Sequence, residues 1–157
     1  MHTDRLLRRT LALAEQSLLE GNLPFGCLLA DQEGRILLEA LNTVVTGKDL
    51  IGHCEINLVH ALQDQYTAEE LAACTLYAST EPCPMCAAAV FWSGIGEIVY
   101  ALGKDQYHKI SGTTNPAHIM DLKAKDLLQY GRRKVKVSGP LLEEEAIAFY
   151  RPLYAEW

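Results

Sequence analysis

The sequence lacks a long hydrophobic run and has few cysteines, and both shortages exclude classes of protein. Its opening segment, MHTDRLLRRTLALAEQSLLEG, carries charges and contains no apolar stretch of signal-peptide or membrane-spanning length. The five cysteines, at positions 27, 54, 74, 83 and 86, are an odd number and do not suit a fully paired disulfide framework. We therefore expect a cytoplasmic protein, with no membrane partner, whose thiols bind metal or lie buried.

Positive charge is also scarce. The chain has 14 Lys and Arg against 20 Asp and Glu, a formal net charge of -6. Such a balance repels a polyphosphate backbone and argues against a nucleic-acid partner. Local clusters, such as the RRK segment at 132–134, keep that possibility open, although a solvated face is the simpler interpretation.

The 157 residues, 49% of them hydrophobic, suffice for one domain spanning 1–157. Strand-like and helix-like patterns alternate along it, which indicates an α/β layered fold. We expect strands over 27–30, 35–40, 75–80, 97–102 and 134–139. We expect helices from 4 to a stop at 21–22, then over 53–66, 83–93, 121–131 and from Pro140 onward. Residues 103–120 give no clear pattern and are a candidate for substrate contacts.

Two short motifs stand at predicted helix starts: His53-Cys54-Glu55, and PCPMC at 82–86. Two thiolates three positions apart in a first helical turn can hold one metal ion, and the helix N-terminus favours their ionised form. His53 would supply a third ligand. Two cysteines and one histidine leave one position of a tetrahedral zinc ion open, which is typical of a catalytic rather than a structural site.

Glu55 follows the histidine by two residues and supplies the acid–base group that this chemistry needs. Zinc lowers the pKa of bound water from about 15.7 to about 7. Addition of that water to an aromatic carbon that carries an amino group requires a proton transfer to the ring and another to the leaving amine. One carboxylate beside the metal can perform both transfers.

The order H-x-E followed by P-C-x-x-C is the signature of the zinc-dependent base deaminases. The sequence resembles the cytidine deaminase superfamily, in particular the branch of bacterial guanine deaminases, fungal cytosine deaminases and tRNA adenosine deaminases. The resemblance covers nearly the whole chain: it includes LPFGCLLAD at 23–31, Asn42, and AAAVFWSGIGEIVYAL at 87–102. It implies a three-layer α-β-α sandwich around a central five-stranded mixed sheet, and usually a homodimer whose subunits help to shape each other's pockets.

The resemblance also implies roles for individual residues. The implied zinc ligands, for one Zn²⁺ per subunit, are His53, Cys83 and Cys86. Glu55 matches the proton shuttle, Asn42 matches the residue whose side-chain amide holds the base, and Phe25 lies in the loop that lines the same pocket.

Four further positions have alternative interpretations. Cys54 stands where the family mostly has alanine; its main chain should contact substrate, and the alternative is a fourth metal ligand. Trp92 is either a core aromatic or, as in guanine deaminases, stacks on substrate. Tyr154 and Trp157 either cap the final helix or close over an active site, as the C-terminal segment of guanine deaminases does.

These residues predict hydrolytic deamination of a small amino-substituted nucleobase, nucleoside or related heterocycle, with release of ammonia. Trp92 and the aromatic tail favour a guanine-type base. A cytosine-type base comes next, because the stretch 104–118 offers Asp105 but not the acidic pair usual in guanine deaminases. The alternatives are a tRNA adenosine-to-inosine deaminase, against which the acidic charge argues, and a non-catalytic zinc-stabilised binding module, which would have no need of Glu55.

Overall fold

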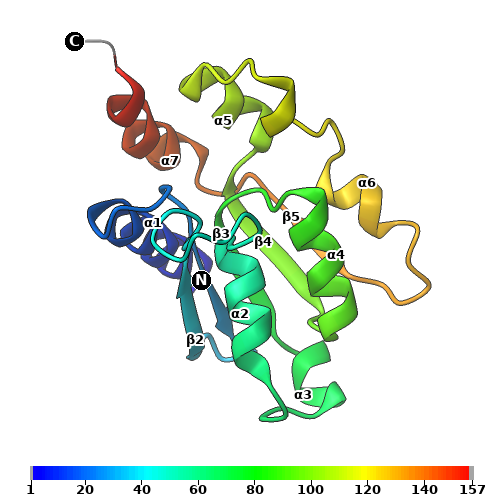
Figure 1. Ribbon diagram of the computed structural model, residues 1–157. Coiled ribbons are helices and arrows are strands. Elements are labelled where there is room, and N and C mark those ends of the chain that lie inside the picture. Colours follow the sequence, from blue (N-terminus) through cyan, green and yellow to red (C-terminus); the bar gives the residue numbers. More distant parts are fainter. Residues whose placement is uncertain (1, 156–157) are drawn as a thin grey trace.

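The computed structural model describes residues 2–155 and has a five-stranded mixed sheet at its centre (Figure 1). The strands are β1 (Gly26–Ala30), β2 (Ile36–Leu41), β3 (Thr75–Thr80), β4 (Glu97–Leu102) and β5 (Lys136–Ser138), in the order β2-β1-β3-β4-β5. Strand β1 is antiparallel to both of its neighbours, whereas β3, β4 and β5 run parallel to one another. The predicted strands are thus present, with β5 shorter than expected.

Helices cover both faces of the sheet, so the fold is the expected three-layer α-β-α sandwich. Helices α1 (Thr3–Leu19) and α7 (Glu143–Tyr150) lie on one face, and α2 (Cys54–Leu62), α4 (Pro84–Ser93) and α6 (Ala124–Leu128) lie on the other. Alternation along β3 separates the two cores: Leu76 and Ala78 pack with α2 and α4, while Tyr77 packs with α1 and α7. Among the described residues, no helix is long and apolar enough to cross a membrane.

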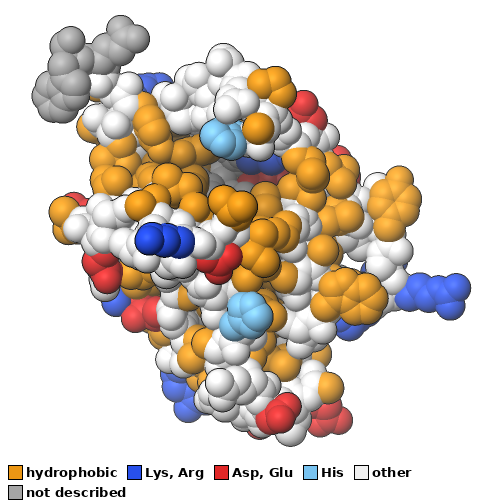
Figure 2. Space-filling model, viewed as in Figure 1, with side chains coloured by type: hydrophobic (Ala, Val, Ile, Leu, Met, Phe, Trp, Pro, Cys, Tyr) orange, Lys and Arg blue, Asp and Glu red, His pale blue; other side chains and the backbone are white. Residues whose placement is uncertain are grey.

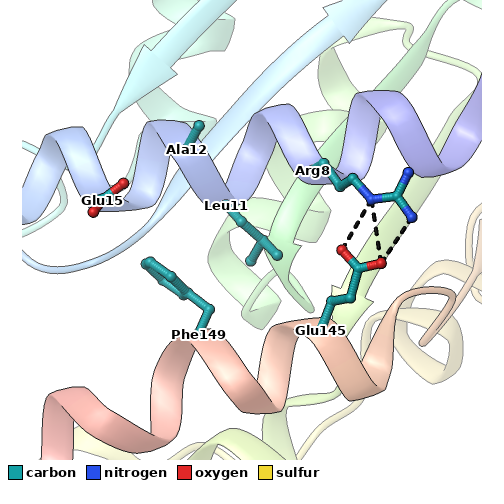
Figure 3. Close-up of a pocket in the computed structure, with 6 residues that line it drawn as sticks. All are labelled: Arg8, Leu11, Ala12, Glu15, Glu145 and Phe149. Carbon is teal, nitrogen blue, oxygen red and sulfur yellow. Dashed lines mark hydrogen bonds and ion pairs between the residues drawn. The ribbon is translucent and has the colours of Figure 1, made fainter.

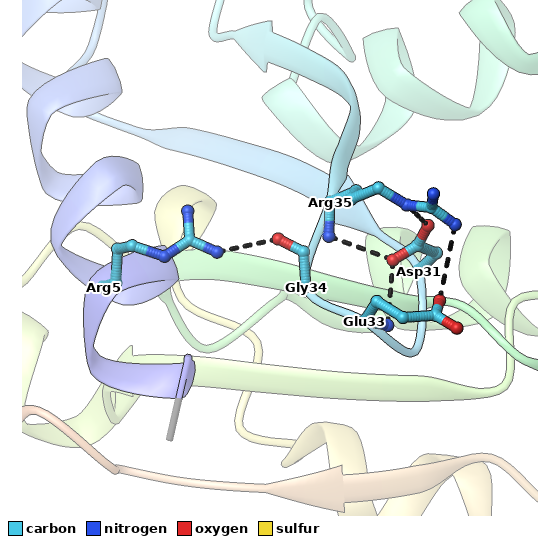
Figure 4. A network of polar contacts seen from close by, with 5 residues as sticks. All are labelled: Arg5, Asp31, Glu33, Gly34 and Arg35. Atoms are coloured by element: carbon cyan, nitrogen blue, oxygen red, sulfur yellow. Dashed lines mark hydrogen bonds and ion pairs between the residues drawn. The ribbon is translucent and has the colours of Figure 1, made fainter.

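The turn between β1 and β2 is held by Asp31, as Figure 4 shows. Its Oδ1 accepts the backbone N–H groups of Glu33 and Arg35, at 2.9 and 3.0 Å, and its Oδ2 accepts Arg35 Nε at 2.6 Å. Arg5 on α1 donates to the carbonyl of Gly34 at 2.8 Å. A short polar turn therefore closes the predicted hairpin and fastens it to the first helix.

Helix α1 lies very close to β1. A Cβ on Gly26 would come within 2.5 Å of the Leu13 Cβ, so only glycine fits at this crossing. Helix α7 packs beside α1, where Arg8 and Glu145 form an ion pair at 2.8 Å at one end of a shallow groove (Figure 3). This groove lies on the face of the sheet opposite α2 and α4.

Local sequence features determine where α2 and α4 begin and where α4 ends. His53 and Cys83 are the N-cap residues of α2 and α4, both with extended backbone angles. Pro84 occupies the first turn of α4, where its missing N–H has no intrahelical partner to lose, and α4 stops at Gly94 with φ +95°. His53 and Cys83, at which these helices begin, are therefore two of the three residues that the sequence predicts as metal ligands.

The helical structure after the first motif differs from expectation in two ways. Helix α2 ends at Leu62 rather than near 66, because Gln63 takes a positive φ of 47°. A short helix that the sequence analysis missed, α3 (Ala68–Ala72), follows at once. It begins with a capping box in which Thr67 and Glu70 satisfy each other's backbone N–H groups.

The helices of the C-terminal third differ from expectation in their positions and lengths. The stretch 103–120 forms α5 (Lys104–Ser111) and a single 3-10 turn, η1 (Pro116–His118). Helix α6 covers only five residues of the expected 121–131. The final helix begins at Glu143 rather than at Pro140, which follows a cis peptide bond, and continues into a 3-10 turn, η2 (Arg151–Tyr154).

Candidate metal centre and active site

The structure brings the three predicted zinc ligands together where α2 and α4 begin. His53 Nδ1 lies 3.6 Å from Cys83 Sγ and 3.4 Å from Cys86 Sγ, and the two sulfurs are 3.6 Å apart. With Zn–S bonds of about 2.3 Å and Zn–N bonds of about 2.0 Å, the edges of a tetrahedron measure about 3.5–3.8 Å. The three donor atoms therefore fit the corners of one zinc site, and we call them the metal group.

The two thiols of the metal group differ in acidity. The pKa of Cys83 falls to about 4, through hydrogen bonds from the Cys86 thiol and from His53. The pKa of Cys86 rises in turn, first because of Cys83 and then because of burial. Two thiolates 3.6 Å apart repel each other, so one ionises readily and the other resists. A divalent cation between them would remove that conflict, which is what the donor set of a zinc site requires.

Glu55 lies beside the metal group in the first turn of α2. Its side chain is buried, and its negative charge contributes to the raised pKa values of both His53 and Cys86. The carboxylate Oε1 accepts a hydrogen bond from the Cys54 thiol at 2.9 Å. A buried carboxylate beside this donor set is chemically able to accept and return a proton.

Cys54 belongs to a second cluster. Its Sγ groups with Cys27 Sγ and a carboxylate oxygen of Glu55, all within 4.8 Å of one another. The thiol of Cys54 is thus not part of the metal group of the described residues, and the structure gives no support to its interpretation as a fourth ligand. Cys27 and Cys74, expected as buried thiols, are 0% and 3% exposed.

Asn42 and Phe25 are neighbours. The backbone N–H of Asn42 donates to the carbonyl of Phe25 at 3.2 Å. Asn42 is 1% exposed, and its Oδ1 accepts the backbone N–H of Val44 at 3.0 Å. Its amide nitrogen donates to no residue between 2 and 155, so it keeps a free donor of the kind that can hold a planar base. Figure 2 shows the surface hollowed between α5 and the segment that leads into α2.

An aromatic cluster that the sequence analysis missed surrounds Phe25. The Phe25 ring stacks edge-on against Tyr107 at 5.2 Å and lies 6.5 Å from Tyr150. The hydroxyls of Tyr107 and Tyr154 are 2.6 Å apart, and Tyr150 donates to the carbonyl of Pro24 at 2.8 Å. The C-terminal segment therefore contacts the loop of Phe25 through Tyr150, whereas Tyr154 contacts Tyr107 of α5. The other predicted tail residue, Trp157, lies outside the described residues.

Trp92 is not a core residue. It is 82% exposed in the last turn of α4, and its only aromatic neighbour in the described chain is Phe91, at 5.1 Å. Nine residues of helix separate it from Cys83, a rise of about 14 Å. This subunit alone does not bring Trp92 to the metal group.

Comparisons with known proteins agree with this geometry. A family model described as the cytidine and deoxycytidylate deaminase zinc-binding region matches residues 1–102. A probable cytosine deaminase of Schizosaccharomyces pombe is 34% identical over 90% of this chain and 85% of its own length. A tRNA-specific adenosine deaminase of Bacillus subtilis is 32% identical over 85% of this chain and 80% of its own.

Solved structures share the fold as well. A guanine deaminase from Nitrosomonas europaea superimposes with a TM-score of 0.78 and 25% identity, over 96% of this chain and 84% of that one. The region matched by the family model contains the whole metal group, and the relatives align over most of their length. The chain therefore belongs to the cytidine and deoxycytidylate deaminase family of zinc-dependent hydrolases, which act on amidine C–N bonds.

Proposed function

We propose that this protein hydrolyses the exocyclic amino group of a small nucleobase, nucleoside or related heterocycle, with a guanine-type base as the favoured substrate and a cytosine-type base next. The observation that carries the proposal is the burial of Glu55 against the metal group, where its charge perturbs both His53 and Cys86. A structural zinc site does not need a buried carboxylate that is not a metal ligand, and burying such a charge costs free energy.

The residues divide the chemical work among them. His53, Cys83 and Cys86 would hold the zinc ion, which would supply Lewis-acid activation of a water molecule. Glu55 accepts a proton from the attacking water and passes it to a ring nitrogen. It then takes the remaining proton of the added hydroxyl group and delivers it to the amino group, so that the C–N bond breaks and a ring carbonyl and ammonia are formed. Asn42 holds the ring through its free amide donor, and the main chain at Cys54 contacts it.

The proposed substrate is a free planar ring because an aromatic residue neighbours Asn42. The Phe25 carbonyl accepts the backbone N–H of Asn42, and the partly buried Phe25 ring offers a flat apolar surface suited to a heterocycle rather than to a chain of nucleotides. The relatives named above act on guanine and cytosine according to their names. They support these two bases as the first candidates.

Ammonia release should be measured with the zinc-loaded protein across guanine, cytosine, adenine, isocytosine, their nucleosides, pterins and triazines. A tRNA anticodon stem-loop is assayed in parallel. Fast turnover of one small ring supports the proposal and identifies the ring. Activity on the stem-loop alone would contradict it. The absence of ammonia release from every small ring, with zinc bound and the fold intact, would also overturn the proposal.

A tRNA adenosine deaminase is the second candidate, because the Bacillus subtilis relative has that name. The formal charge of -6 argues against it, since an RNA backbone needs a basic approach surface. A binding module without catalysis is the third. The position of Glu55 argues against that role.

We also propose a homodimer of single-domain chains, residues 1–157, working in the cytoplasm. All five cysteines are free thiols, which suits a reducing compartment. Hydrophobic side chains gather on the face of α2 and α4 in Figure 2. Large hydrophobics that are strongly exposed include Trp92 at 82% and Leu50 at 90%. A second copy covering this face would bury them and would bring Trp92 toward the partner's pocket.

Sedimentation of the wild-type protein and of Trp92→Glu tests the dimer. We expect a dimeric wild type and a variant shifted toward monomer with unchanged unfolding temperature, because an exposed side chain contributes little to the fold of one subunit. Leu19→Glu, at an 81% exposed hydrophobic residue at the end of α1, on the opposite face of the sheet, is the matched control. A wild type that stays monomeric at high concentration would rule out the assembly.

A further inference from the structure

We propose that Cys54 is a positioning residue for the deamination reaction: its thiol holds Glu55 through a hydrogen bond to Oε1 and fixes the carboxylate beside the metal group. The proposal rests on the function proposed above, because it assigns the orientation of the carboxylate that moves the proton. It goes beyond the main-chain role expected of this position.

The contact is not a by-product of helix geometry. Cys54 and Glu55 are consecutive residues in the first turn of α2, and side chains at i and i+1 diverge around a helix. Their atoms nevertheless meet at 2.9 Å, with exposed fractions of 1% and 6%. The Glu55 side chain has therefore turned back toward its neighbour, and a hydrogen bond at this site selects one rotamer of the carboxylate.

Cys27 is the other close neighbour of the Cys54 thiol. It lies on β1, fully buried, and its sulfur is within 4.8 Å of that of Cys54. Leu58 and Ala87 pack in the same core, so the thiol has an apolar surround and two polar neighbours. One of these neighbours is the second thiol and the other is the carboxylate, which is the stronger acceptor.

Glu55 is also close in the chain to the metal group. It lies in the first turn of α2, two residues after His53, which caps that helix. A thiol is a weak donor, so it can hold one oxygen without competing strongly for the proton that the other oxygen transfers. Alanine at position 54 would leave the same backbone and zinc ligands but a freer carboxylate.

The kinetic test compares Cys54→Ala and Cys54→Ser with the wild type on whichever ring it deaminates. We expect Cys54→Ala to lower kcat about tenfold with KM changed by less than about twofold, and Cys54→Ser to restore most of the loss because it keeps a donor. Cys74→Ala, which removes a buried thiol from the same core, is the matched control and should keep full activity. Zinc content and unfolding temperature are measured for each variant.

A readout independent of turnover separates this proposal from the proposed function. The S–H stretching band of Cys54, found by infrared difference between wild type and Cys54→Ser, should be shifted to lower frequency by the hydrogen bond. The shift should diminish in Glu55→Ala and persist in Cys74→Ala. These spectra need no substrate, and they decide the geometry even if no ring is deaminated or if Cys54→Ala fails to fold.

Two results would overturn the assignment. An S–H band at the frequency of a free thiol in the wild type would mean that Cys54 does not donate to Glu55. Equal losses of kcat in Cys54→Ala and Cys54→Ser, with zinc retained, would mean that the residue acts through packing alone.

Discussion

The carboxylate of Glu81 accepts the backbone N–H of Lys104, from Oε1 at 3.2 Å. Its second oxygen accepts the backbone N–H of Ala124 at 3.0 Å. These N–H groups belong to the first turns of α5 and α6 and have no partner within their own helices. One buried side chain, two residues before the first thiol of the metal group, therefore fixes the starts of two helices.

Replacement of Glu81 by alanine should reduce the free energy of unfolding by about 3 kcal/mol, because it leaves two buried N–H groups without an acceptor. Urea denaturation of the zinc-loaded protein measures the change. Glu15→Ala, at an exposed position of α1, should change it by less than about 0.5 kcal/mol. A loss no larger in Glu81→Ala than in this control would contradict the proposed role of the carboxylate.

The metal group could be predicted from the sequence because its geometry is local. His53 and Cys83 are helix caps, and Cys86 is one turn further on, so their spacing in the chain determines most of their placement in space. The strands and the long first helix were also predictable, since their hydrophobic patterns are periodic.

The aromatic cluster was not predictable in the same way. Phe25, Tyr107 and Tyr154 come from three distant segments, and only tertiary packing brings them together. Helix α5 is short and polar, so its periodicity was too weak to recognise. Helix α3, in contrast, had a usable signal in the Thr67 and Glu70 capping box.

Orientation and exposure of single side chains were the hardest to predict. The cluster of Cys54 and Glu55 includes Cys27, which lies on a different element. Trp92 follows a helical pattern and was expected either in the core or on substrate, yet it is exposed at the far end of α4. A sequence pattern predicts which residues share a face of a helix, but it does not predict which other parts of the fold cover that face.

After removal of the metal, one thiol should react with an alkylating agent before the others. After chelation at neutral pH, we expect iodoacetamide to alkylate Cys83 first, because its pKa of about 4 makes it a thiolate and it is partly exposed. Cys86 should react later, since its pKa is raised and it is buried. Peptide mass spectrometry after timed quenching gives the order.

Two controls accompany the alkylation. Zinc-loaded protein should resist labelling at both positions, and protein in denaturant should be labelled at all five cysteines. Faster labelling of Cys86 than of Cys83 would show that the assigned acidities are reversed.

Alkaline pH should weaken the fold through its buried tyrosines. Burial raises the pKa values of Tyr107, Tyr150 and Tyr154, so the folded protein holds these phenol protons at a pH where the unfolded chain releases them. Stability from these groups is fully present below about pH 10 and is lost as the pH rises through the window above it. Urea denaturation at about pH 8 and about pH 11 should show the fall.

Tyr107→Phe separates the contribution of the hydrogen bond to Tyr154 from that of the raised pKa of Tyr107. At neutral pH it should cost about 1 kcal/mol, because the 2.6 Å hydrogen bond to Tyr154 disappears. Its further loss between the two pH values should be smaller than that of the wild type, since one raised pKa is gone. An identical alkaline loss would indicate that Tyr107 ionises at its ordinary pKa in the folded protein.

The central claim is that Glu55 moves the proton in a zinc-dependent deamination. The most direct test is ammonia release from guanine and cytosine by the wild type and by Glu55→Gln, each with zinc content and circular dichroism measured on the same sample. We predict turnover of at least one of the rings by the wild type, and a loss of at least about a hundredfold in the variant with zinc and fold retained. An unchanged rate in Glu55→Gln would contradict the account.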